Sequence, residues 1–143
     1  MSDFVLSDQL LYQVNVLAGR LSRAFAARYK AEIGLTVPEW RVLAHLSQAS
    51  SVSIREIVQK VEMEKSRVSR AVSRLEAAGY VSKAADERDK RLVALALTPS
   101  GREMFQRLVP MTQAFEAEIT AQLGDRADAF RDGLRVLLDK GDI

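Results

Sequence analysis

Residues 65–81 have the sequence KSRVSRAVSRLEAAGYV, and this stretch decides which fold the chain can form. Its apolar side chains recur at helical spacing and predict one amphipathic helix over residues 65–78, with a buried side made of Val68, Ala71, Val72, Leu75 and Ala78. The opposite side is basic and rich in serine. Gly79 follows at the position where a glycine commonly ends a helix.

A second, shorter helix is predicted immediately before this one. Ser53 and Glu56 have the spacing of a capping box, in which each side chain bonds the other residue's backbone at a helix start. Ile54, Ile57 and Val61 then form a short apolar stripe. Because only residues 62–64 separate the two helices, the pair has the pattern of a helix-turn-helix.

Two short strands are predicted after the helix pair, over residues 80–83 and 92–97. Between them lies DERDKR, residues 86–91, a run of charged side chains that cannot be buried. The run must therefore form the exposed tip of a β-hairpin, or wing. A glycine of the kind favoured in two-residue hairpins is missing, so the loop is expected to be longer.

Helices are predicted on both sides of this central block. Residues 7–33 form a long helix that ends at Gly34, and Thr36, Pro38 and Glu39 start the next helix. A further long helix covers residues 99–123, where Pro110 is expected to introduce a kink, and a last helix follows residue 125. The predicted fold class is mainly α with a small β-wing.

Length and composition exclude several kinds of protein. The chain has 143 residues, of which 48% are hydrophobic and 28% charged, as expected of a soluble domain. Its longest apolar run, residues 92–97, is far too short to cross a bilayer, and the N-terminus lacks the features of a secretory signal. We therefore expect a cytoplasmic protein without membrane contact.

Cysteine is absent, and His45 is the single histidine. Disulfides, thiolate metal sites and cysteine nucleophiles are excluded, and neither a metal site nor a cofactor is expected. An enzyme is not expected either, because the sequence offers no nucleophile paired with a base and no glycine-rich phosphate loop.

The charge is unevenly distributed. The net charge of the chain is only +2, but residues 65–102 contain nine basic and four acidic side chains, a surplus of five positive charges. The predicted basic helix and the wing both lie in this block. Such a concentration of positive charge is typical of a contact with nucleic acid.

Taken together, these motifs resemble the MarR family of bacterial winged-helix transcription regulators. The resemblance rests on four stretches in the expected order, which are WRVL at residues 40–43, KSRVSR and RLEAAGYV within 65–81, DERDKR at 86–91 and LTPSG at 97–101. The wing sequence followed by the LTPSG helix start is the most specific of them, and the resemblance covers nearly the whole chain.

The resemblance implies a homodimer that binds a palindromic DNA operator and is released by a small effector. One MarR-like domain is expected over residues 1–143, with a winged helix-turn-helix lobe at 36–97 and dimerisation helices built from the N-terminal and C-terminal segments, 1–34 and 99–143. Arginine can hydrogen-bond guanine through two donors in the major groove. The residues expected to contact double-stranded DNA are Lys65, Ser66, Arg67, Ser69, Arg70, Ser73, Arg74, Arg88, Lys90 and Arg91.

In this family the effectors are often aromatic acids. Arg41 and His45 lie four residues apart on one helix, so both can hold the same carboxylate. Tyr12, Asn15 and Trp40 are expected to line the remainder of the ligand site. The alternative function is a winged-helix module that contacts RNA or protein and does not bind an operator.

Overall fold

The structure is a computed structural model of the chain, and it describes residues 3–49, 52–61, 63–85, 87–89 and 93–141. The chain divides into two compact units, Met1–Leu108 and Val109–Ile143, and each is described by itself. The division falls inside the long helix α5, next to Pro110, which cannot donate a backbone hydrogen bond.

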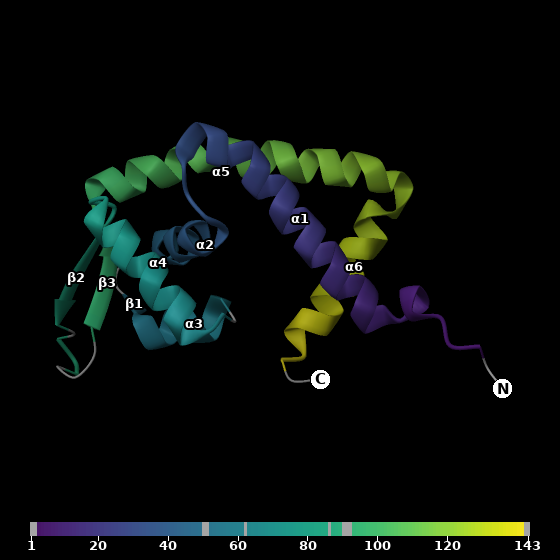
Figure 1. The fold of residues 1–143 in the computed structure, drawn as a ribbon, viewed down its shortest axis with the longest axis horizontal. Helices are drawn as coiled ribbons and strands as arrows, with labels where there is room; N and C mark the ends of the chain where they lie inside the picture. Colours follow the sequence, from purple (N-terminus) through teal and green to yellow (C-terminus); the bar gives the residue numbers. More distant parts are fainter. Residues whose placement is uncertain (1–2, 50–51, 62, 86, 90–92, 142–143) are drawn as a thin grey trace. The chain divides into compact units, whose positions relative to one another are not determined.

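The elements of the first unit run from η1 to the first part of α5 (Figure 1). Their bounds are η1 Leu6–Asp8, α1 Leu10–Ile33, α2 Val37–Ser47, β1 Val52–Ser53, α3 Ile54–Val61, α4 Lys65–Ala77, β2 Val81–Ala85, β3 Val93–Leu97 and the start of α5, which spans Pro99–Leu123. The second unit contains the remainder of α5, η2 Gly124–Arg126 and α6 Ala127–Asp139. The predicted helices are therefore confirmed to within a few residues at their ends.

The core of the first unit lies where α2, α3 and α4 pack on one another and on β3. On α4 the buried residues are Val68, Ala71, Val72 and Leu75, as the helical spacing predicts. Ala78 is exposed because α4 ends at Ala77 and Ala78 is its C-terminal cap. The Thr36–Glu39 capping box at the start of α2 is confirmed in both directions.

The end of α4 is tied to the start of α5. Gly79 adopts a left-handed backbone with φ of 84°, and the Tyr80 amide donates to the Leu75 carbonyl at 2.9 Å, which closes the helix. The Thr98 hydroxyl donates to the Gly79 carbonyl at 2.6 Å and accepts from the Gly101 amide at 3.0 Å. One threonine therefore joins the last turn of α4 to the first turn of α5.

The sheet has three strands in the order β1-β3-β2, all antiparallel. Strands β2 and β3 form the predicted hairpin, with Val81 opposite Leu97 and Ala85 opposite Val93. The sequence did not predict β1, in which Val52 lies opposite Leu95. Two residues are too few to show a periodic pattern, so nothing local distinguishes β1 from a loop.

Each unit also carries apolar side chains that its own residues leave exposed. In α1 only Phe25 and Tyr29 are buried, whereas Leu10, Leu11, Val14 and Leu17 are exposed. In the second unit α6 has no buried residue, and Phe130, Leu134 and Leu137 are exposed. Exposed apolar surface of this extent is typical of a protein interface.

Candidate nucleic-acid interface

Helix α4 presents a basic face to solvent. Lys65, Ser66, Arg67, Arg70, Ser73 and Arg74 are exposed, and Ser69 is half-buried. The opposite side of the helix is buried against the lobe, so the helix cannot rotate to hide this face. Every residue of α4 that was predicted to contact DNA therefore lies at or near the surface.

Arg67, Arg70 and Arg74 follow one another at steps of three and four residues, which places their guanidinium groups along one side of α4. A helix that enters the major groove presents such a row of side chains to the base edges and the adjacent phosphates. The arrangement is the one that a recognition helix requires.

The wing extends from the same lobe. The loop between β2 and β3 joins Ala85 to Val93, and within it Arg88 is exposed and Asp89 is half-buried. Both residues interact with other residues of the structure. The predicted DNA contacts Lys90 and Arg91 lie outside the described residues, so they remain predictions, as does the contact of Arg88.

The structure adds one residue that the sequence analysis treated only as a helix cap. Glu39 of α2 is buried, and its Oε1 accepts a hydrogen bond from Nε of Arg74 at 2.6 Å. Its Oε2 accepts from the Thr36 amide at 3.3 Å. A signal for burial was present, since Glu39 precedes Leu43 and Leu46 at helical spacing, but the partner lies 35 residues away.

The predicted ligand residues Arg41 and His45 lie on α2, and both are half-buried. Burial lowers the pKa of His45, and the nearby positive charge of Lys60 lowers it further. The lowered pKa favours the neutral form of His45.

Trp40 belongs to an aromatic cluster with Phe25 and Tyr29 of α1. The ring centroid of Phe25 lies 4.3 Å from that of Tyr29 and 5.6 Å from that of Trp40. Burial raises the pKa of Tyr29 to about 12, while the charge of Arg41 acts in the opposite direction. Among the described residues neither the Tyr29 hydroxyl nor the Trp40 Nε1 has a hydrogen-bond partner, although both are buried.

The other two predicted ligand residues lie far from this cluster along α1. Tyr12 and Asn15 are exposed, and they precede Phe25 by thirteen and ten residues. At about 1.5 Å per residue these separations correspond to roughly 20 Å and 15 Å along the helix axis. Within one chain, α1 therefore keeps Tyr12 and Asn15 well away from Trp40.

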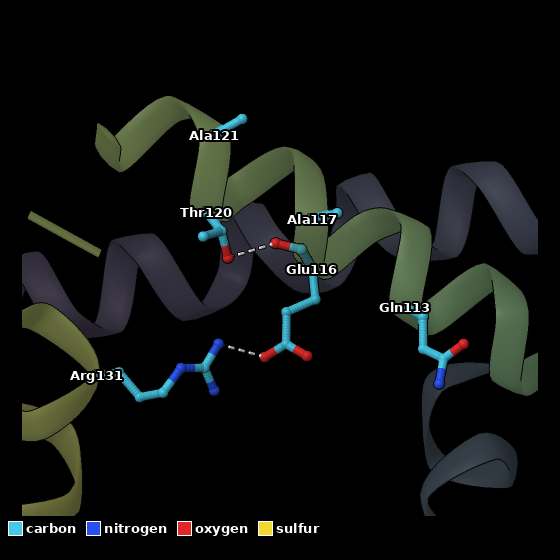
Figure 2. Close-up of a pocket in the computed structure, with 6 residues that line it drawn as sticks. All are labelled: Gln113, Glu116, Ala117, Thr120, Ala121 and Arg131. Carbon is cyan, nitrogen blue, oxygen red and sulfur yellow. Dashed lines mark hydrogen bonds and ion pairs between the residues drawn. The ribbon is translucent and has the colours of Figure 1, made fainter. Parts of the chain in front are cut away.

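The second unit contains an open pocket of about 500 Å³ between α5 and α6 (Figure 2), lined by Gln113, Glu116, Ala117, Thr120, Ala121 and Arg131. Arg131 donates to Glu116 across it at 2.7 Å, and both side chains are largely exposed. An exposed ion pair contributes little interaction energy, and this pocket holds none of the predicted ligand residues. We therefore do not assign it a ligand.

No described helix has both the length and the apolar character needed to cross a membrane. Across the same residues, no group of three or more metal-binding side chains comes together.

Comparison with known proteins identifies the family. The sequence profile of the MarR family matches residues 33–92, which include α2, α3, α4 and β2. The crystal structure of SPO1453, a MarR family transcriptional regulator from Silicibacter pomeroyi DSS-3, matches with a TM-score of 0.83 and 35% identity, over 98% of this chain and 100% of that one. The chain belongs to the MarR family. It is therefore a transcription regulator with a DNA-binding winged helix.

Two relatives with characterised names show which effects on transcription occur among similar proteins. The transcriptional activatory protein BadR of Rhodopseudomonas palustris is 29% identical over 124 residues, which cover 84% of this chain and 69% of BadR. The transcriptional repressor Rv2887 of Mycobacterium tuberculosis is 29% identical over 114 residues, covering 80% of this chain and 79% of Rv2887. The similarity thus includes proteins named for opposite effects on transcription.

Proposed function

We propose that this MarR family member is a homodimeric repressor that binds a palindromic operator and is released by a small aromatic acid or a related thioester. The basic face of α4 carries the proposal, because its buried side is packed and its exposed side is lined with arginine and serine. The cytoplasm is the compartment in which such a protein meets DNA.

The dimer is supported by the exposed apolar side chains of α1 and of α6 described above. The dimerisation segments proposed are 1–34 and 99–143, and the DNA-binding lobe is 36–97. Two lobes related by twofold symmetry would read two half-sites, which accounts for a palindrome. The similarity to Rv2887, named a repressor, supports repression by this chain, whereas the similarity to BadR, named an activatory protein, supports the opposite effect.

Selection of bound duplexes from a random pool tests operator binding and symmetry together. We expect the recovered sequences to share an inverted repeat whose half-sites are centred about one helical turn apart. A pool of structured RNA is selected in parallel as the control. Recovery of RNA alone, or of duplexes without a repeat, contradicts the proposal and favours the alternative of a module for RNA or protein contact.

The effector site is proposed around Arg41, His45 and Trp40, with Tyr12 and Asn15 supplied by α1 of the other subunit of the proposed dimer. Two observations support a ligand there. Arg41 can pair with a carboxylate, and the buried Tyr29 hydroxyl and Trp40 Nε1 lack acceptors among the described residues. A buried donor without a partner costs about 1–3 kcal/mol, so a ligand oxygen that accepts from either one gains affinity.

Thermal unfolding in the presence of benzoate, 4-hydroxybenzoate or benzoyl-coenzyme A tests this site. We expect at least one of these compounds to raise the melting temperature of the wild type. At a concentration of roughly 100 Kd, the bound compound should add about 3 kcal/mol to the free energy of unfolding. Arg41→Ala should abolish the shift because the carboxylate loses its charged partner.

Arg55→Ala, which removes an exposed arginine from α3, is the matched control and should respond like the wild type. If no compound stabilises the wild type, or if Arg41→Ala responds as strongly, the proposed effector site is wrong. Neither outcome contradicts the proposed operator binding by α4, which the duplex selection tests separately.

A further inference from the structure

Glu39 and Arg74 form an ion pair in which one side chain is buried and the other is half exposed. The Glu39 side chain is 8% exposed, whereas the Arg74 side chain is 51% exposed. The carboxylate therefore lies inside the lobe and the guanidinium group reaches from it to the surface. A half-exposed guanidinium group keeps much of its hydration while it pairs with the buried carboxylate, and it remains accessible to a partner outside the lobe.

Glu39 is itself held in place from two directions. It belongs to the first turn of α2, where Oε2 accepts from the Thr36 amide and the Glu39 amide donates to the Thr36 hydroxyl at 3.4 Å. A carboxylate fixed at a helix start in this way has little freedom to move. Its other oxygen, Oε1, consequently offers Arg74 a fixed acceptor.

The bond to Glu39 uses only Nε of Arg74. A guanidinium group is planar and carries five donor hydrogens, of which Nε supplies one and the two Nη nitrogens supply four. The plane of the group is set by the bond to Nε, and the Nη donors are left for a second acceptor. Arg74 also continues the row of Arg67 and Arg70 on the exposed face of α4.

We infer that Glu39 is a positioning residue for DNA binding, which holds Arg74 through Nε so that its two Nη groups bind a backbone phosphate. The inference rests on the proposed contact of α4 with DNA. It assigns a role in DNA affinity to a buried glutamate of α2 that touches no nucleic acid. Because the side chain of Arg74 is oriented before binding, less conformational entropy is lost on contact with the phosphate.

Two other roles for the pair predict different results. If Glu39 withholds Arg74 from DNA, removing its charge releases the arginine and binding becomes tighter. If Glu39 only stabilises the lobe, its removal weakens binding to the same degree whether or not Arg74 is present. A double-mutant cycle separates these roles from the positioning role.

The experiment measures fluorescence anisotropy of a labelled duplex recovered by the selection above, at a series of salt concentrations. We expect Glu39→Gln to weaken binding about tenfold, and Arg74→Gln to weaken it at least as much and to lower the salt slope by about 0.9, the value for one phosphate contact. In the Arg74→Gln background, Glu39→Gln should change the affinity less than twofold. Tighter binding by Glu39→Gln, or an equal effect in both backgrounds, overturns the inference.

Glu56→Gln is the matched control, because Glu56 lies at the same position in the first turn of α3. Its amide donates to the Ser53 hydroxyl at 3.1 Å, and its Oε1 accepts from that hydroxyl at 3.2 Å, so only one half of the predicted capping box forms. It should alter the affinity less than twofold. If Glu39→Gln does not fold, Arg74→Lys replaces it, since lysine keeps the charge but cannot bond Glu39 and a phosphate from one rigid plane. Arg74→Lys should bind about fivefold more weakly, and wild-type affinity at every salt concentration overturns the inference.

Wild-type binding to the selected duplex tests the proposed function separately. If the wild type binds and the variants behave additively, operator binding holds and the positioning role fails. If the wild type does not bind the duplex, both fail.

Discussion

Gly101→Ala is expected to lower the free energy of unfolding by about 3 kcal/mol, the upper part of the range for overpacked sites. A Cβ added at Gly101 would lie 1.9 Å from the carbonyl oxygen of Tyr80, which is backbone and cannot rotate away. That carbonyl also accepts from the Thr98 amide at 3.1 Å. The substitution therefore forces α5 away from the end of α4 and breaks the threonine contact between them.

Urea and thermal unfolding at a fixed protein concentration measure the effect, with an expected fall in melting temperature of roughly 10 °C. Ser100→Ala is the control, since Ser100 is the exposed neighbour of Gly101 in the same turn and alanine favours the helix. It should change the stability by less than about 0.5 kcal/mol. A Gly101→Ala variant as stable as the wild type would show that the two helices are not held together at this point.

The double substitution Arg67→Ala with Arg70→Ala is expected to weaken binding to the selected duplex about 100-fold or more. Each arginine that pairs with a guanine contributes about 1–3 kcal/mol of discrimination, and both are exposed on the face of α4. The ratio of affinities for the selected and a scrambled duplex should fall toward one. Anisotropy titrations of both duplexes measure it.

Neither arginine is buried, so the variant should retain the circular dichroism and melting temperature of the wild type. Lys30→Ala, which removes an exposed positive charge from the last turn of α1, is the control and should bind the selected duplex normally. Unchanged discrimination by the double variant would remove α4 from the major groove and contradict the proposed operator contact.

The parts of the fold that were predicted correctly are those determined by neighbouring residues. The buried side of α4, the Thr36 capping box and the left-handed Gly79 each depend on side chains within one or two turns. The wing was predicted because a charged loop between apolar strands admits few other structures. The family resemblance then supplied the expected order of these elements, which the comparisons confirmed.

What the sequence did not show depends on residues distant along the chain. Strand β1 exists because Val52 pairs with Leu95, and its two residues carry no period of their own. The capping glutamate Glu39 was recognised, but its bond to Arg74 connects two helices whose packing no local pattern specifies. For the same reason Arg74 was predicted only as a DNA contact, and its restraint by α2 was not.

The separation of the two sides of α4 also defines how the protein can be redesigned. Val68, Ala71, Val72 and Leu75 hold the helix in the lobe, and Thr98 with Gly79 closes its end, so these positions must stay unchanged. Lys65, Ser66, Arg67, Arg70 and Ser73 are exposed and can be randomised together without altering the core. Given the proposed contact of α4 with the operator, we expect a library restricted to those five positions to change which operators are bound while the scaffold stays the same.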